Sequence, residues 1–176
     1  MHLDDSACNL ASLNLLAFLA DPADGETHGF DVDDFCRAVE VVFTAQEILV
    51  GHADYPTPAI AETTRAFRQL GLGYANLGAV LMALGMPYDS EAGRSVASAI
   101  TSLMTGHAYL TSARMAEQLG PFDGFATNRG PTLAVLERHR AAAETLDDSD
   151  TPARVDAGRR DRKSVVQGKS VDLGGR

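Results

Sequence analysis

The sequence predicts a mostly α-helical fold with at most one or two short strands near its start. Three observations support this prediction. Alanine and leucine dominate the apolar residues, whereas aromatic residues make up only 6% of the chain, and this composition favours helices. Apolar residues recur at three- and four-residue steps, as on one face of a helix. Residue types typical of helix ends flank several of these stretches.

The first helix is expected to begin near Asp31 or Asp33, either of which can cap it, and to stop near Gly51. Residues 5–19 are expected to form an extended entry followed by an apolar stretch, and residues 21–29 a loop rich in Asp, Gly and Pro. The helix expected to end near Gly51 has an apolar stripe at helical spacing, formed by Val32, Phe35, Val39, Val42, Phe43 and Leu49.

The middle of the chain is expected to form two shorter helices. Residues 55–58 are a stiff extended connector because prolines disfavour helix in the residues before them. A helix over residues 59–67 follows, and then residues 70–74 are expected to form a tight turn. A second helix leads from this turn to Gly85.

Residues 90–146 are predicted to form two long helices. Ser90 is expected to cap a helix that runs to Leu119 and ends at Gly120. One face of this helix carries unusually small residues and can approach a neighbouring backbone closely. Pro131 suits the start of the final helix, which is expected to end around Leu146.

Charge is unevenly distributed along the chain. The net charge is −9, but residues 1–153 carry −13 and residues 154–176 carry +4. An acidic body repels polyphosphate backbones, so we expect no nucleic-acid partner. No apolar run is long enough for a membrane span, and the acidic start does not resemble a secretory signal. We therefore expect a cytoplasmic protein with no membrane partner.

The residues that commonly bind metals are scattered. Cys8 and Cys36 are 28 positions apart, neither belongs to a C-x-x-C pair, and no histidine lies at a metal-ligand interval from either. No metal site is expected. Gly71 and Gly73 match the first two glycines of a G-x-G-x-x-G nucleotide-binding loop. Asn76 occupies the position of the third glycine, so the motif is incomplete. A turn and close helix packing explain these glycines better.

Cys8 is the candidate catalytic residue. It lies between small and amide side chains before an apolar element, so its thiol can point into a site. The alternative is a small buried core residue, since cysteines without a disulfide partner are among the most buried residue types. Local composition favours this alternative. Cys36, inside the first predicted helix beside Phe35, is interpreted as a packing residue.

Several motifs in order along the chain resemble the catalytic chains of ribonucleotide reductases, and in particular the adenosylcobalamin-dependent class II. The motifs are DDSACNLASLNL at residues 4–15, FDV at 30–32, TAQEILV at 44–50, YPTPAIA at 55–61, LGLGYANLG at 70–78, LMALG at 81–85 and LMTG at 103–106. The resemblance fades after Arg140. It implies that residues 1–152 are an internal fragment of the ten-stranded α/β barrel of these catalytic subunits.

The resemblance also implies a chemistry for Cys8. In this family, adenosylcobalamin generates a radical that is passed to a cysteine, and the resulting thiyl activates the ribose. Two further thiols then reduce the ribonucleotide and close into a redox-active disulfide, which a thioredoxin-like reductant resets. Cys8 matches one of these two thiols. The family's thiyl cysteine and second redox cysteine have no counterpart here, so the fragment is expected to be inactive alone.

Two alternatives to a class II fragment stay open. One is a fragment of a class I large chain, which obtains its radical from a partner subunit, and the other is a non-enzymatic helical interaction module. The sequence does not decide between diphosphate and triphosphate substrates or indicate an oligomeric state. Residues 153–176 are expected to be a disordered, non-native tail. Residues 161–176 resemble a translated sequencing adapter, and Lys163 and Lys169, the two lysines of the chain, lie there.

Overall fold

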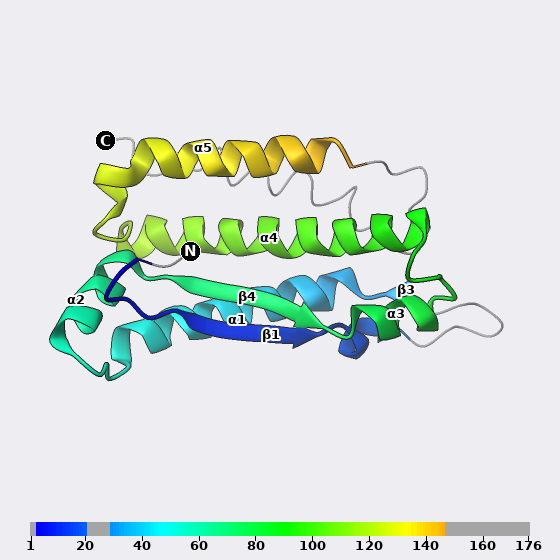
Figure 1. The fold of residues 1–176 in the computed structure, drawn as a ribbon, viewed down its shortest axis with the longest axis horizontal. Helices are drawn as coiled ribbons and strands as arrows, with labels where there is room; N and C mark the ends of the chain where they lie inside the picture. Colours follow the sequence, from blue (N-terminus) through cyan, green and yellow to red (C-terminus); the bar gives the residue numbers. More distant parts are fainter. Residues whose placement is uncertain (1–2, 21–28, 147–176) are drawn as a thin grey trace.

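The computed structural model describes residues 3–20 and 29–146, and within them the chain is built in layers. The first layer is a parallel pair of strands, β1 (Asn9–Asn14) and β4 (Leu70–Ala75). Helix α1 (Val32–His52) packs against both strands, and α4 (Glu91–Leu119) packs against α1. Helix α5 (Phe125–Glu144) runs alongside α4 on the side away from the strands (Figure 1). The expected tail at 153–176 lies outside the described residues.

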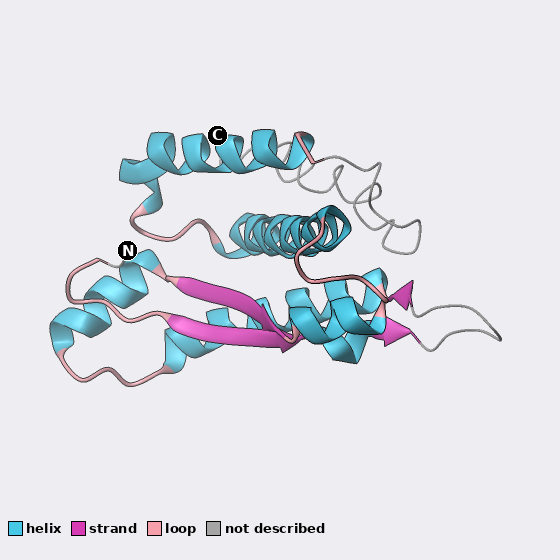
Figure 2. Ribbon diagram, turned by 45° about the vertical axis from the view of Figure 1, so that its right-hand side comes forward, coloured by secondary structure: helices cyan, strands magenta, loops and turns pink. Residues whose placement is uncertain are grey.

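Short elements connect these layers. A 3-10 turn, η1 (Leu15–Phe18), follows β1, and β2 (Leu19–Ala20) pairs with β3 (Gly29–Phe30) in an antiparallel bridge. Helix α2 (Pro58–Phe67) precedes β4 in the sequence, and α3 (Leu77–Ala83) follows it. Figure 2 shows the helices and strands of the described fold in separate colours. The described part of the chain is therefore mostly helical, as predicted, and it does not close into a barrel.

Strand β4 corrects the prediction of a tight turn over residues 70–74. All six residues of β4 pair with β1 in parallel register, from Asn9 opposite Leu70 to Asn14 opposite Ala75. Alternation of side chains explains the error: Leu72 and Tyr74 pack on the core, and Gly71 and Gly73 lie on the other face. Two glycines in a short run are typical of a turn, but here they occupy alternate positions of a strand.

Helix α1 carries the centre of the core. Its N-cap is Asp31, whose side chain accepts a hydrogen bond of 2.9 Å from the backbone N–H of Asp34. Phe35 is fully buried and meets Phe18 and Phe30 at centroid distances of 5.2 and 5.3 Å, edge-on geometries that aromatic rings prefer. The helix runs through Gly51 to His52. The predicted stripe was wrong at Leu49, which is 54% exposed.

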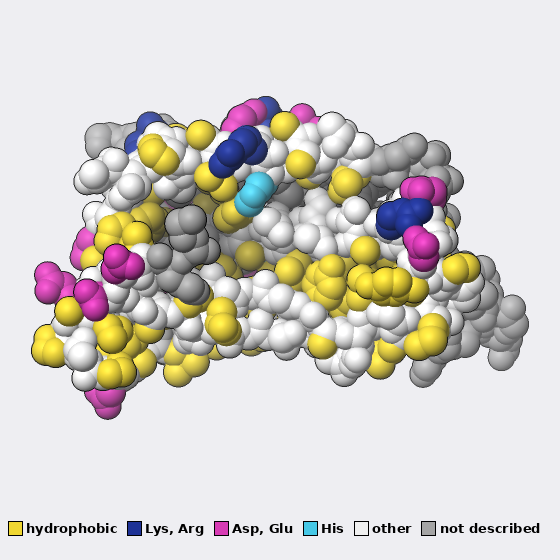
Figure 3. Space-filling view, in the orientation of Figure 1, with side chains coloured by type: hydrophobic (Ala, Val, Ile, Leu, Met, Phe, Trp, Pro, Cys, Tyr) yellow, Lys and Arg dark blue, Asp and Glu magenta, His cyan; other side chains and the backbone are white. Residues whose placement is uncertain are grey.

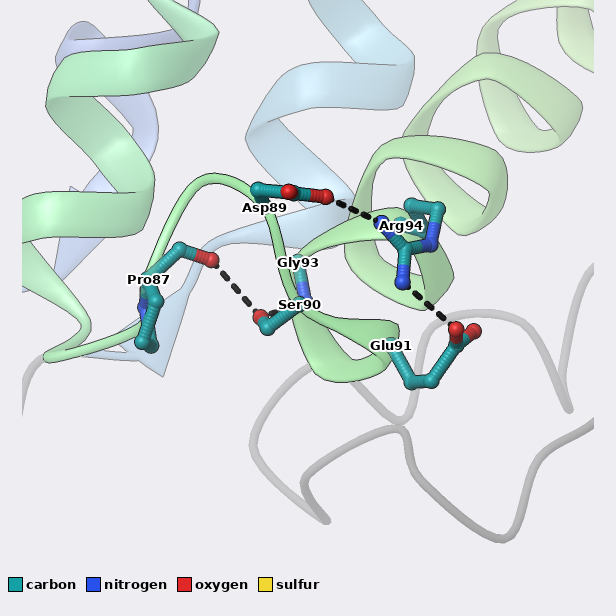
Figure 4. Close-up of polar contacts among 6 residues, drawn as sticks. All are labelled: Pro87, Asp89, Ser90, Glu91, Gly93 and Arg94. Atoms are coloured by element: carbon teal, nitrogen blue, oxygen red, sulfur yellow. Dashed lines mark hydrogen bonds and ion pairs between the residues drawn. The ribbon is translucent and has the colours of Figure 1, made fainter.

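The start of α4 agrees with the prediction in detail (Figure 4). The Ser90 hydroxyl accepts a hydrogen bond of 3.0 Å from the Gly93 N–H and donates one of 2.7 Å to the Pro87 carbonyl. Arg94 pairs with Asp89 and Glu91, and its hydrogen bond lowers the pKa of the Glu91 carboxyl. The helix ends at Leu119, and Gly120 follows with φ of +86°.

Helix α5 corrects the predicted start at Pro131. It begins at Phe125, and Pro131 lies inside it. The reason is packing: Phe125 is buried and meets Phe122 edge-on at 5.6 Å, and Phe122 in turn lies 6.5 Å from Phe67 of α2. This aromatic cluster fixes the first turn of the helix six residues before the proline. Its end at Glu144 is close to the predicted one.

Gly93→Ala is expected to destabilise the fold by about 1–3 kcal/mol, the range for overpacking a well-packed site. A Cβ at Gly93 would lie 2.8 Å from the Pro87 carbonyl oxygen, which is backbone and cannot move without disturbing the cap. Gly78→Ala is the matched control, because its Cβ would meet only the Tyr88 ring at 3.8 Å. Urea unfolding of the full chain followed by circular dichroism measures both. Equal midpoints would contradict this account of the α4 start.

Candidate active site around Cys8

Cys8 lies on the face of the strand pair that α1 does not cover. Leu13 of β1 points into the core, and the alternate residue Leu10 is 73% exposed. A Cβ built on Gly71 would lie 2.4 Å from the Leu10 Cδ2 and 3.6 Å from the Cys8 Sγ, which places Cys8, Leu10 and Gly71 on one side. We call this side, formed by Cys8, Leu10, Ser12, Asn14, Gly71 and Gly73, the open face.

The open face has room beside the thiol. A Cβ on Gly73 would meet nothing within 4 Å, and Ser12 and Asn14 are exposed. Gly73 therefore leaves open space on this face, bordered by polar side chains, whereas the tip of the Leu10 side chain lies over Gly71 beside the Cys8 sulfur. At its far end, the Asn76 amide donates a hydrogen bond of 2.9 Å to the Asn14 side-chain oxygen. A ligand can approach the sulfur from this side of the described fold.

The segment that carries Cys8 is held by side chains from other elements. The Ala7 N–H donates a hydrogen bond of 2.8 Å to the buried Thr64 hydroxyl of α2. The Ser6 hydroxyl lies 3.2 Å from the Gln69 side-chain oxygen, and the Cys8 thiol lies 3.7 Å from the Asn9 carbonyl, within hydrogen-bonding reach for sulfur. Long-range contacts therefore fix the backbone on the N-terminal side of the thiol.

Gln46 of α1 is a site residue that the sequence did not single out. Its side-chain amide donates to the Asn9 carbonyl at 3.0 Å and to the Gly71 carbonyl at 2.8 Å, while the Asn9 amide donates to the Gln46 carbonyl at 3.3 Å. The residue lies within one of the family-like motifs, but nothing local distinguishes it from a solvent-facing helical glutamine. Its burial and partners become visible only in the fold.

Cys36 is confirmed as a packing residue and is not the partner of Cys8. It packs beside Phe35 against the hydrophobic core, and no disulfide joins it to Cys8. Gln46, which contacts the residue after Cys8, lies ten residues further along α1, or about 15 Å at 1.5 Å per residue. A disulfide requires Cα atoms within roughly 7 Å.

No group of three or more His, Cys, Asp or Glu side chains is arranged to hold a metal ion in residues 3–20 and 29–146. His107 lies 3.8 Å from Glu40, between α4 and α1, and His139 shares a 3.0 Å hydrogen bond with the Tyr109 hydroxyl. Both contacts are local pairs between helices. Gly71 and Gly73 lie within a strand and do not form a nucleotide loop. His2 and His28 are outside the described residues.

A cavity of about 1250 Å³ extends along α4 and α5, on the other side of β4 from the thiol. Leu70 and Leu72 line it from β4, and these side chains alternate with the glycines of the open face. Figure 3 shows a hollow below α5 with apolar side chains along it. Cys8 is not among the lining residues, so this cavity and the thiol are separate features.

The chain belongs to the ribonucleotide reductase family. The family model described as "Ribonucleotide reductase, barrel domain" matches residues 1–157. Among curated relatives, the vitamin B12-dependent ribonucleotide reductases of Streptomyces clavuligerus and Streptomyces coelicolor are 54% and 55% identical over 155 residues. That of Rhodopirellula baltica is 49% identical over 153 residues.

These matches cover 86–87% of this chain but 14–16% of the relatives. The chain therefore spans about one sixth of the length of the curated relatives it matches. A closed barrel is not expected from such a portion, which explains the two-stranded pair in the structure. In the described ranges, no helix combines the length and apolar character needed to cross a membrane.

Gly71→Val is expected to slow alkylation of Cys8 several-fold, because its side chain would displace the tip of Leu10 and stand against the sulfur on the open face. Gly73→Val is the matched control, since it adds the same side chain to the same strand face where there is open space. Mass spectrometry of the alkylated peptide measures the rate in each variant. Equal slowing by both substitutions would contradict the position assigned to the thiol.

Proposed function

We propose that residues 1–152 are part of the catalytic barrel of a vitamin B12-dependent ribonucleotide reductase and that Cys8 is one of the two thiols that reduce the ribonucleotide. The single observation that carries this proposal is the position of Cys8 on the open face of a strand pair whose other face is packed on a helix. In a closed barrel with helices outside, that face is the interior. Family membership and the names of the relatives support the reaction class.

The proposed role of Cys8 is a two-electron reduction. The ribose loses its 2′ hydroxyl as water, and a hydrogen takes that place on the carbon. Two thiols supply two electrons and two protons and become a disulfide, so atoms and electrons balance. A thioredoxin-like reductant then returns the disulfide to two thiols. Cys8 is partly exposed, so a sugar can reach its sulfur.

The second thiol is proposed to come from another part of the complete enzyme. Cys36 is excluded because it packs in the core, about 15 Å along α1 from Gln46, which contacts the residue after Cys8. A thiol in that position cannot close a disulfide with Cys8 without unpacking Phe35 and its aromatic neighbours. The coverage of one sixth of the relatives leaves ample chain to supply the partner.

Adenosylcobalamin is the cofactor proposed for the complete enzyme, since the relatives are named for vitamin B12 dependence. When bound, it supplies the radical that starts the reaction. The described residues do not by themselves fit this group: the large cavity lies across β4 from Cys8, and the residues that line it do not include the thiol. We therefore assign no step of the cofactor to residues of this chain.

The B12-dependent relatives support the cobalamin class over a class I large chain. The exposed Leu10 and the uncovered strands argue against a free-standing helical module, because a parallel pair is normally covered on both faces. A cytoplasmic location is consistent with this reaction.

Replacement of Cys8 tests the proposal in a complete enzyme. Residues 3–146 of this chain would replace the matching segment of the Streptomyces clavuligerus reductase, which is 54% identical. The chimera is expected to make deoxynucleotides repeatedly when supplied with adenosylcobalamin and a dithiol. Cys8→Ser should abolish multiple turnover, because one electron donor is lost.

Cys36→Ser in the same chimera is the control and should retain activity, since Cys36 is a packing residue. Product is measured by chromatography of labelled nucleotides. Undiminished multiple turnover in the Cys8→Ser chimera would show that this thiol does not donate the electrons.

A further inference from the structure

We infer that Gln46 is a positioning residue for the Cys8 thiol, acting through the Asn9 carbonyl that both side chains contact. The catalytic meaning of this role rests on the function proposed for Cys8. The contact geometry itself does not depend on that function. No feature of the family resemblance assigns a role to this glutamine.

Gln46 joins the two strands at the end where Cys8 lies. Its two amide hydrogens are donated to carbonyls of different strands, Asn9 of β1 and Gly71 of β4. The Asn9 side chain returns a hydrogen bond to the Gln46 backbone. Because both acceptors are carbonyl oxygens, the orientation of the amide is determined by its contacts. The helix therefore fixes the distance between β1 and β4 beside the thiol.

The Asn9 carbonyl links Gln46 to the sulfur. Its oxygen lies 3.0 Å from the Gln46 Nε2 and 3.7 Å from the Cys8 Sγ. A hydrogen bond to a carbonyl oxygen has preferred directions near the plane of the carbonyl group. The Gln46 amide occupies one of these directions and holds the peptide plane in place. The thiol hydrogen can therefore approach the Asn9 oxygen only from the remaining directions. Gln46 thus determines how the S–H bond is oriented at the start of β1.

Simple packing does not explain a glutamine at this place. Gln46 is 2% exposed, and its Oε1 atom is buried with no hydrogen-bond partner among the described residues. An unsatisfied buried oxygen carries the full penalty of its lost hydration. A methionine of similar volume would fill the space without that cost. The donors, not the volume, are therefore what this position requires, and they are directed at the backbone around Cys8.

The test measures the reaction of Cys8 with 4,4′-dithiodipyridine in the full 176-residue chain carrying Cys36→Ser. Gln46→Met keeps the volume and removes both donors, so the Asn9 carbonyl is no longer held toward the sulfur. The reaction of Cys8 should then be about fivefold faster, the change expected when the single hydrogen bond from the thiol to that carbonyl is lost. Thr111→Val is the control. Thr111 is a buried polar residue whose hydroxyl donates to the His107 carbonyl within α4, away from the thiol, so its loss should leave the rate unchanged.

Gln46→Glu separates positioning from general stability. A buried carboxyl facing two carbonyl oxygens resists ionisation, and its acid form has one O–H to donate. The rate should therefore be near that of the parent at pH 5 and rise to that of Gln46→Met as the carboxyl ionises at higher pH. A residue that acts only through packing would give no such pH-dependent rescue relative to Gln46→Met.

Three outcomes would overturn the inference: equal rates in Gln46→Met and the parent, equal effects of Gln46→Met and Thr111→Val, or a parent that reacts as fast in buffer as in urea. The thiol reagent involves no nucleotide or cofactor. If the Cys8→Ser chimera kept multiple turnover, the proposed function would be refuted, but the measured effect of Gln46 on the thiol would stand. If Gln46→Met had no effect on the thiol, the inference about Gln46 would be refuted, but the proposed role of Cys8 would stand.

Discussion

The fold depends on one constraint, the parallel pairing of β1 with β4 against α1. Parallel strands cannot be joined by a hairpin, so the chain crosses from one to the other through α1 and α2, and α1 covers one face of the pair. Gln46 reinforces this arrangement from the helix side, because it bonds the backbone of both strands at once. The resulting register pairs Leu10 with Gly71. It places the Cys8 sulfur on the same side of the strands as Gly71, which is the open face.

The two faces of the strand pair differ in chemistry in a way that fits a barrel wall. Leu13, Leu72 and Tyr74 pack toward the helices, whereas the opposite face carries glycines and exposed side chains. Parallel sheets are normally buried on both sides. The face that carries the thiol at its edge is left uncovered in the described part of the chain, with Leu10 73% exposed on it.

Local signals predicted much of the helical structure, and long-range contacts account for the errors. Ser90 and Gly120 mark the ends of α4 through hydrogen bonds and backbone angles within a few residues, so the sequence was sufficient there. Strand β4 depends on a partner some sixty residues away, and the local signal of its glycines favoured a turn. Pro131 was misleading because the contact of Phe125 with Phe122 starts α5 earlier.

The candidate site shows the same division. Cys8 was singled out by its neighbours and by the family resemblance, whereas local composition alone favoured a buried structural cysteine. Gln46 had no distinguishing local signal, because a glutamine on a helix is normally exposed and its burial here arises from two strands separated in sequence. The sequence can indicate a candidate reactive atom. The residues that orient such an atom are recognised only once the fold has brought their backbone partners together.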